Sequence, residues 1–165
     1  IPHLDLFGSI ILPALLVITG AGFILGWAKP VVFNPFNLKN RRWGPALVAL
    51  AGPASNLLIA IIFGVIIRFA PGLGIEQASP FLFIASGIVF VNILLAIFNL
   101  IPVPPLDGHH VLFAVLPDQK FRKVKDFLRR YSLVLVLVVI FFLWRFIMPV
   151  VSFLFQVFTG SSFGL

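Results

Sequence analysis

The sequence predicts an all-α polytopic membrane protein with about four transmembrane helices and a short membrane-associated β-strand or hairpin near residues 30–40. Of its 165 residues, 61% are hydrophobic, only 10% are charged, and 20 are Phe. Soluble domains have roughly a quarter of their residues charged. Apolar stretches long enough to cross a bilayer alternate with short polar connections. We therefore expect one transmembrane domain over residues 1–165 and no soluble domain.

Four apolar stretches have the length that a helix needs to cross a hydrocarbon core of about 30 Å. In chain order they run from about Leu6 to Ala28, from Gly44 to Phe69, from Phe81 to Ile101, and from Tyr131 to about Ser152. In the last of them, Pro149 is expected to kink the helix or to begin an interfacial tail.

The second and third stretches each have one face of small and polar residues. On the second this face holds Gly52, Asn56, Ala60 and Gly64, and on the third it holds Ala85, Asn92, Ala96 and Asn99. Small residues let helices approach closely in lipid. We expect the two faces to meet, with interhelical hydrogen bonds as the default role of the three asparagines.

Two connections hold most of the positive charge. Residues 29–43 and 117–130 together carry ten of the twelve Lys and Arg residues, whereas residues 70–80 carry only Glu76 as a charged side chain. The positive-inside rule then predicts a multi-pass protein of the cell membrane with both basic connections in the cytoplasm. Attraction to the lipid bilayer explains these charges better than binding of nucleic acid, which we do not expect.

The two basic connections differ in their predicted structure. Residues 29–43 contain β-branched and aromatic residues bounded by Pro and Asn, a pattern that favours a short strand and turn. Residues 117–130 predict a helix with Phe121, Val124 and Leu128 along one stripe and basic residues around it. Such a helix lies on the membrane surface.

Asp107 is the residue that most needs an explanation. It follows Pro102, Pro104 and Pro105 at the end of the third stretch, where prolines stop a helix and release backbone carbonyls. An Asp at membrane depth costs about 2.5 to 3.5 kcal/mol and is usually functional. Taken alone it fits a proton relay, an ion ligand or a metal ligand. Because the chain has no Cys, thiolate ligands and nucleophiles are excluded.

The neighbouring residues resemble a known family. The block Asn99-Leu-Ile-Pro-Val-Pro-Pro-Leu-Asp107-Gly108, preceded by Gly52-Pro53-Ala54-Ser55-Asn56, closely resembles two motifs of the site-2 proteases. These enzymes are intramembrane zinc metalloproteases. Pro2-His3-Leu4-Asp5 with Gly8, and matches within residues 29–39, extend the resemblance over nearly the whole chain. The chain looks like the short bacterial and archaeal branch, which implies a prokaryotic source.

The resemblance implies a ligand set for Zn²⁺. In the family, a His-Glu-x-x-His helix supplies two ligands and the general base, and the Asp of Leu-Asp-Gly supplies the third ligand, which here is Asp107. No His-Glu-x-x-His occurs in this sequence, and its only Glu is Glu76. By family order the missing helix belongs just before Ile1. We expect a chain cut at its N-terminus that is inactive by itself.

Further roles follow from the same resemblance. Val31, Val32, Phe33 and Asn34 would form an extended edge that receives the substrate as an added strand. Asn56 and Asn99 would hold the opened substrate or the developing oxyanion. The residues expected to line the cavity or support the ligand are Pro53, Pro104, Pro105, Gly108, His109 and His110.

The histidines are weaker candidates for metal ligands. His109 and His110 are adjacent and would diverge by about 100° on a helix, whereas two ligands on one helix normally sit four residues apart. For them, lining of the cavity is favoured over ligation. His3, which stands with Asp5 in its motif, is expected to form a turn or a cap far from Asp107.

We predict a zinc-dependent intramembrane endopeptidase that cleaves the transmembrane helices of single-pass substrate proteins. One alternative is a non-catalytic, membrane-embedded relative that binds such helices without cutting them. Another is a transporter subunit that uses Asp107 as a proton or ion site, which an inverted internal repeat would favour, and the sequence shows none. The sequence indicates neither the substrate's identity nor an oligomeric state.

Overall fold

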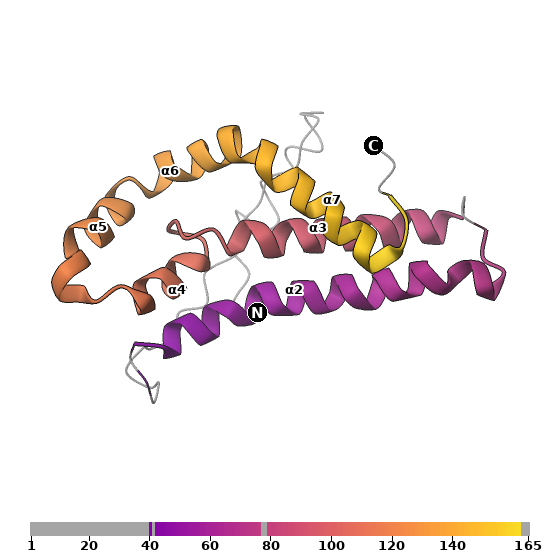
Figure 1. Cartoon of the computed structure of the whole chain (residues 1–165), viewed down its shortest axis with the longest axis horizontal. Helices are drawn as coiled ribbons and strands as arrows, with labels where there is room; N and C mark the ends of the chain where they lie inside the picture. The colour runs from indigo at the N-terminus through magenta and orange to yellow at the C-terminus, as the bar shows by residue number, and fades with distance from the viewer. Residues whose placement is uncertain (1–39, 41, 77–78, 163–165) are drawn as a thin grey trace, which may run out of the picture. The chain divides into compact units, whose positions relative to one another are not determined.

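The computed structural model describes residue 40, residues 42–76 and residues 79–162, all within one compact unit, residues 38–165 (Figure 1). These residues form helices, and no strand occurs among them. In chain order the helices are α2 (Gly44–Phe69), α3 (Pro80–Asn99), α4 (Gly108–Val115), α5 (Asp118–Arg130), α6 (Ser132–Val138) and α7 (Trp144–Thr159). The predicted first span, the strand near residues 30–40 and the proposed substrate edge from Val31 to Asn34 lie outside the described residues.

Helices α2 and α3 are long and apolar enough to cross a membrane. Helix α2 has the predicted bounds, and a short 3₁₀ turn, Ala70–Leu73, extends it to 30 residues. Helix α3 begins at Pro80 and ends at Asn99, two residues before the predicted end. The earlier end is explained by Pro102, which has no N–H to donate to Phe98, so the helix cannot run on through it.

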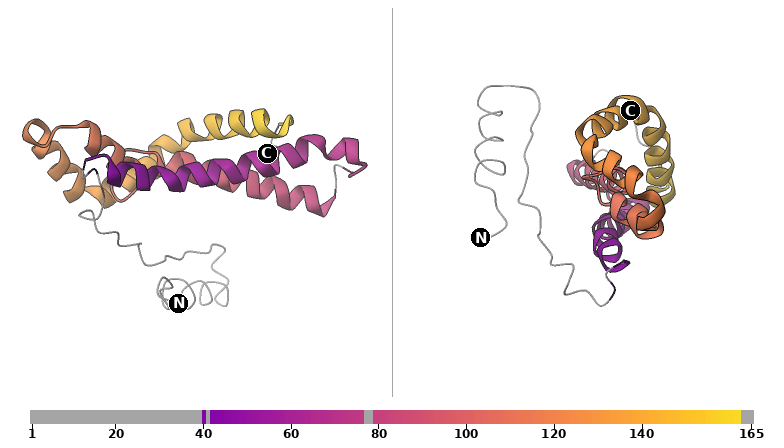
Figure 2. Two further views of the ribbon diagram at one scale, coloured as in Figure 1. Left: turned by 90° about the horizontal axis from the view of Figure 1, so that it is seen from below. Right: turned by 90° about the vertical axis from the view of Figure 1, so that its left-hand side faces the viewer.

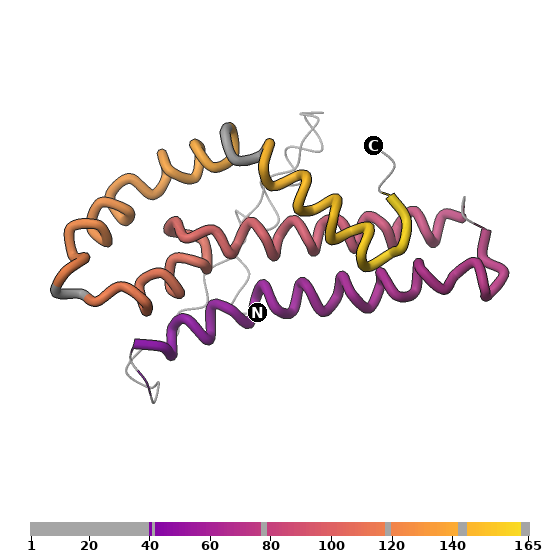
Figure 3. The backbone as a smooth tube through the Cα atoms, viewed as in Figure 1, coloured from indigo at the N-terminus to yellow at the C-terminus, as the bar shows by residue number. Residues whose placement is uncertain are grey.

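The predicted fourth span is broken. Residues 139–143 form a π-helical segment between α6 and α7, and the two helices are bent by 64° (Figure 3). A π segment inserts an extra residue into a helical turn, which is one of the known causes of such bends. Pro149 lies inside α7, away from the bend, and α7 continues to Thr159. The described residues thus hold two membrane-length helices, or three if the bent pair is one span.

Three helices meet in the core. Ala60 of α2, Val89 and Ile93 of α3, and Val151 and Phe155 of α7 are almost fully buried. Figure 2 shows α7 alongside the α2–α3 pair.

The contact between α2 and α7 depends on Gly64. A Cβ atom at this position would lie 2.7 Å from Cβ of Phe158, closer than real side chains approach. The absence of a side chain on Gly64 therefore permits α7 to pack against α2.

The predicted small-residue faces are partly confirmed. Helices α2 and α3 pack against each other, and Ala60, Ala85 and Ala96 are buried. Among the described residues, the amide of Asn92 donates to the carbonyl of Ile88 in its own helix at 2.8 Å, and the interhelical bond expected for it stays a prediction. A bond to the preceding turn satisfies the amide without a partner helix.

Candidate functional site

Asp107 lies in a tight turn between α3 and α4. After α3 ends, Val103 N–H donates to Ile101 O at 2.8 Å and Leu106 N–H donates to Val103 O at 2.9 Å. Asp107 is half-buried and occupies the position before the first residue of α4, but its carboxylate does not cap that helix. The backbone turn thus sets the position of Asp107, and its carboxylate is not used to start α4.

Gly108 allows α4 to begin directly against the end of α3. A Cβ atom on Gly108 would lie 2.6 Å from Ile101 O and would overlap the carbonyl of Leu100. Because these are backbone atoms, no side-chain rotation would relieve the contact. A glycine is therefore required after Asp107 for structural reasons. Gly108 lets the chain turn back at the end of α3, and this turn fixes the position of Asp107.

Gly52 of α2 lies next to the Asp107 carboxylate. A Cβ atom at Gly52 would be 3.2 Å from Oδ2 of Asp107, tighter than nearly all real contacts of this kind. The adjoining Pro53 is fully buried. The structure thus brings together the two sequence blocks that carry the family resemblance, although Gly52 and Asp107 are 55 positions apart in the chain.

The other end of α4 is held by two cations. Arg42 donates through Nε to Ala114 O at 2.6 Å and through Nη2 to Val115 O at 3.0 Å. Lys125 of α5 donates through Nζ to Phe113 O at 2.8 Å and is only 7% exposed. The last carbonyls of a helix lack intrahelical partners and carry partial negative charge, so both cations stabilise this terminus.

Sequence reasoning missed both α4 and its cation contacts. Arg42 and Lys125 lie in the basic connections that were interpreted as topology signals. The sequence signal for α4 was present but weak, because an eight-residue helix gives little periodicity and only Pro117 marks its end. A turn at Asn40 orients Arg42, since its side-chain oxygen accepts from the N–H groups of Arg42 and Trp43, both at 3.0 Å.

The two histidines lie on the first turn of α4. Nδ1 of His109 is 2.7 Å from Leu106 O, and its ring stands edge-on to Phe113 with 5.1 Å between ring centroids. The ring centroids of His109 and His110 are 3.9 Å apart. Burial lowers the pKa of His110, His109 and Arg129 lower it further, and Asp107 acts in the opposite direction. The neutral imidazole of His110 is therefore favoured near pH 7.

The remaining predicted site residues do not form one cluster with Asp107 in the contacts described above. Asn56 and Asn99 are half-buried on α2 and at the end of α3, Pro104 is buried, and Pro105 is exposed. Of the predicted site residues, Asp107, Gly108, His109 and His110 take part in the contacts described above, and Pro53 is buried beside Gly52. The roles assigned to Asn56 and Asn99 stay predictions.

The described residues do not complete a metal site. Among residues 40, 42–76 and 79–162, no three His, Cys, Asp or Glu side chains lie close enough together to hold a metal ion. Asp107 can offer one carboxylate, and His109 already contacts a backbone carbonyl. A zinc ion bound at Asp107 would need ligands from residues beyond this set.

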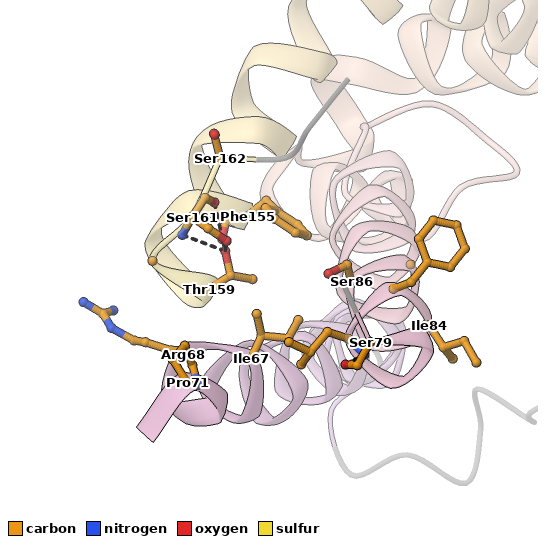
Figure 4. Close-up of a pocket in the computed structure, with 14 residues that line it drawn as sticks. Ile67, Arg68, Pro71, Ser79, Ile84, Ser86, Phe155, Thr159, Ser161 and Ser162 are labelled. Carbon is orange, nitrogen blue, oxygen red and sulfur yellow. Dashed lines mark hydrogen bonds between the residues drawn. The ribbon is translucent and has the colours of Figure 1, made fainter. Parts of the chain in front are cut away.

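A separate pocket lies at the far end of the α2–α3 pair. It has a volume of about 820 Å³ and is lined by Arg68, Ser79, Phe155 and Thr159 among others (Figure 4). None of its lining residues belongs to the Asp107 region. This pocket is thus not where the candidate metal ligand lies.

Comparison with known sequences assigns the region around Asp107. The model of Peptidase family M50, the family of the site-2 proteases, matches residues 75–143. This region of the chain is a Peptidase family M50 sequence. It includes α3, the turn with Asp107, and α4, so the M50 match covers the contacts made by Gly108 and Lys125.

Curated relatives agree with the M50 match. A Bacillus subtilis (strain 168) protein named "Putative zinc metalloprotease YwhC" is 36% identical over 124 residues, which are 71% of this chain and 52% of that protein. Proteins of the same description, MJ0611 of Methanocaldococcus jannaschii and Rip3 of Mycobacterium tuberculosis, are 38% identical over 66 residues and 37% identical over 70 residues. These shorter matches cover 39% and 42% of this chain and 31% and 17% of the relatives.

The chain spans about half the length of YwhC, and less of the other two relatives. No solved structure matches it. The M50 assignment therefore rests on sequence, and the arrangement of α2, α3 and α4 around Asp107 is described here from this chain alone.

Proposed function

We propose that the full-length protein is a zinc-dependent intramembrane endopeptidase that cleaves transmembrane helices of single-pass proteins, and that Asp107 is one of its metal ligands. One observation carries the proposal: the Asp107 carboxylate lies against Gly52, in a region that matches Peptidase family M50. Because Gly52 has no side chain, the carboxylate can lie directly against α2.

The other ligands are proposed to come from a His-Glu-x-x-His helix before Ile1. The short share of the relatives that this chain covers supports that view, because half of YwhC lies outside the match. When bound, zinc would supply a Lewis acid and lower the pKa of a water molecule enough for attack on a peptide carbonyl. The chain's own part is to fix a carboxylate at the end of a transmembrane helix.

Substrate binding is assigned to two groups of residues. Asn56 and Asn99 carry neutral amides that donate hydrogen bonds to an opened peptide or its oxyanion. Residues 31–34 would add the substrate as a strand, which exposes a peptide bond that a helix shields. Cleavage would occur on the side of the basic connections, the cytoplasmic side by the positive-inside rule.

The decisive experiment is Asp107→Asn in the full-length protein, with Asp126→Asn as the matched control. Asp126 is an exposed carboxylate on α5, so the same chemical change there leaves the proposed site untouched. We expect about one zinc per wild-type molecule, loss of zinc and more than a 100-fold loss of cleavage in Asp107→Asn, and neither loss in the control.

Three outcomes would contradict the proposal. Unaltered cleavage in Asp107→Asn would show that Asp107 is not a ligand. Absence of both zinc and cleavage in the wild type would favour a non-catalytic relative. Proton- or ion-coupled transport that depends on Asp107 would favour a transporter.

A further inference from the structure

Helix α5 exposes a stripe of apolar and aromatic side chains. Val124 is 44% exposed, Phe127 is 53% exposed, and Tyr131, the residue after the helix, is 44% exposed. Spacings of three and four residues place them on one face. The rings of Phe127 and Tyr131 touch, with 4.8 Å between centroids. This stripe is covered by no other described element.

Positive charges flank the same stripe. Lys120, Lys123 and Arg130 are all exposed. On a helical projection Lys123 and Arg130 fall beside Phe127, and the guanidinium of Arg130 lies 6.0 Å from the Tyr131 ring. An apolar stripe flanked by Lys and Arg is the pattern of a helix that lies in a membrane interface.

The opposite face of α5 holds α4. Lys125 and Arg129 project there, well over 90° around the helix from Phe127. Nζ of Lys125 bonds to Phe113 O and lies 5.3 Å from the centre of the Phe113 ring, and the Arg129 guanidinium lies 5.1 Å from the same ring. The face turned away from the stripe is therefore attached to the helix that begins next to Asp107.

The position of α5 suits an interfacial helix. Figure 1 shows it between α4 and α6, at the end of the molecule where α2 begins. Since α2 and α3 have the length and composition of transmembrane helices, this end is where the chain leaves the hydrocarbon core.

We propose that α5 docks on an anionic lipid surface through Val124, Phe127 and Tyr131 with the flanking cations, and that its other face transmits this docking to α4. Apolar side chains would enter the boundary between headgroups and acyl chains, while Lys123 and Arg130 meet lipid phosphates. Lys125 and Arg129 are then positioning residues for Asp107. This last consequence rests on the proposed function; the docking does not.

The docking is tested with a fluorescent probe on the full-length protein in vesicles. Because this chain has no Cys, Val124→Cys can be labelled specifically once any cysteines elsewhere in the protein are replaced. The control is Arg122→Cys, an exposed position off the stripe. Vesicles of phosphatidylcholine alone are compared with vesicles containing roughly one third phosphatidylglycerol, and lipid-attached quenchers report burial of the probe.

We expect quenching at position 124 that is several-fold stronger with phosphatidylglycerol, little quenching at position 122, and loss of the difference in Lys123→Gln/Arg130→Gln. Equal exposure of the two probes in both lipids would overturn the proposal and favour a protein partner for this face. High salt should weaken the docking, because exposed charges are screened.

The transmission to α4 is tested by hydrogen exchange of residues 110–116 in the same vesicles. We expect several-fold slower exchange with phosphatidylglycerol in the wild type, and no lipid effect in Lys123→Gln/Arg130→Gln or in Lys125→Gln. A lipid effect that persists in Lys125→Gln would overturn the coupling. Neither readout requires proteolysis, so a failure of this inference and a failure of the proposed function are distinguishable.

Discussion

The two ends of the α2–α3 pair are built in different ways. At the Asp107 end, glycines meet neighbouring atoms directly: Gly52 faces the carboxylate and Gly108 faces the carbonyls of Leu100 and Ile101. At the other end, a pocket of about 820 Å³ remains between α2, α3 and α7, and Gly72 and Gly87 have nothing within 4 Å of a built Cβ.

The difference shows where this chain needs fixed backbone positions. A metal ligand, the role proposed for Asp107, has to be held in place to within a fraction of an ångström by its surroundings. The turn around Asp107 would meet that need with its backbone contacts. The far end joins α2, α3 and α7: Gly64 and Phe158 fix the contact between α2 and α7, and open space remains beside Gly72 and Gly87. Substitutions of the same kind at the two ends should therefore have unequal effects.

The largest expected effect is that of Gly108→Ala. The new methyl group would overlap backbone atoms of the α3 terminus, so α4 cannot stay in place, and we expect a loss of about 3 kcal/mol in the free energy of unfolding. Cleavage by the full-length protein should be lost as well. Thermal denaturation in detergent and an assay with a transmembrane substrate would measure both.

Gly87→Ala is the matched control for Gly108→Ala. Gly87 is exposed on α3 with open space beside it, so alanine should leave stability unchanged or raise it by about 0.5 to 1 kcal/mol. Equal effects of the two substitutions would show that the contacts of Gly108 do not matter.

Gly52→Ala should damage the site more than the fold. A methyl group 3.2 Å from Oδ2 of Asp107 would require the carboxylate to move by a few tenths of an ångström. If Asp107 binds zinc, this displacement should lower zinc affinity or cleavage about 10- to 100-fold. Losses of that size are typical when a group that orients a metal ligand is removed. The unfolding midpoint should change little.

Gly64→Ala is the comparison for Gly52→Ala. Its methyl group would meet Phe158 at 2.7 Å, so it should lower the unfolding midpoint by separating α7 from α2, without a specific loss of zinc affinity. If Gly52→Ala and Gly64→Ala shift zinc affinity and midpoint alike, then Gly52 has only a packing role.

Arg42→Gln tests the cation contacts at the end of α4. It removes a charged donor from Ala114 O and Val115 O, and hydrogen bonds to charged groups contribute about 1.5 to 3 kcal/mol when intact. Because Lys125 still holds Phe113 O, we expect the lower part of that range and about a 10-fold loss of cleavage.

Arg68→Gln is the comparison at the pocket end, where Arg68 donates to Val157 O at 3.2 Å. Its removal should lower stability slightly and leave cleavage unchanged. If Arg68→Gln reduced cleavage more than Arg42→Gln, the pocket end and not the Asp107 end would be the more important one for activity.

The sequence predicted α2, most of α3 and the surface helix α5, because long apolar stretches and a strong amphipathic period are properties of residues close together in the chain. It did not predict α4 or the bend between α6 and α7. An eight-residue helix has too few turns to show a period, and the uniformly apolar run of residues 133–143 gives no sign of a π segment.

The candidate site shows the same limit. Asp107 was found by its cost at membrane depth and by its resemblance to a family motif, and both signals are local. The contacts around it join residues that are far apart in the chain. Gly52 is 55 positions from Asp107, Arg42 is 72 positions from Ala114, and Lys125 is 12 positions from Phe113. Only the packed structure shows that these cations hold the helix next to Asp107 in addition to lying in basic connections.

The smallest expected effect is that of Ser79→Ala at the pocket end. Ser79 caps α3, and its hydroxyl accepts from the N–H of Leu82 at 3.3 Å. Removing such a cap costs about 1 kcal/mol, which should appear as a small drop in the unfolding midpoint. Cleavage should be unchanged, because the cap lies at the opposite end of α3 from Asp107. If Ser79→Ala reduced cleavage as much as Gly52→Ala, then the pocket end would contribute to the site, and the division between the two ends would fail.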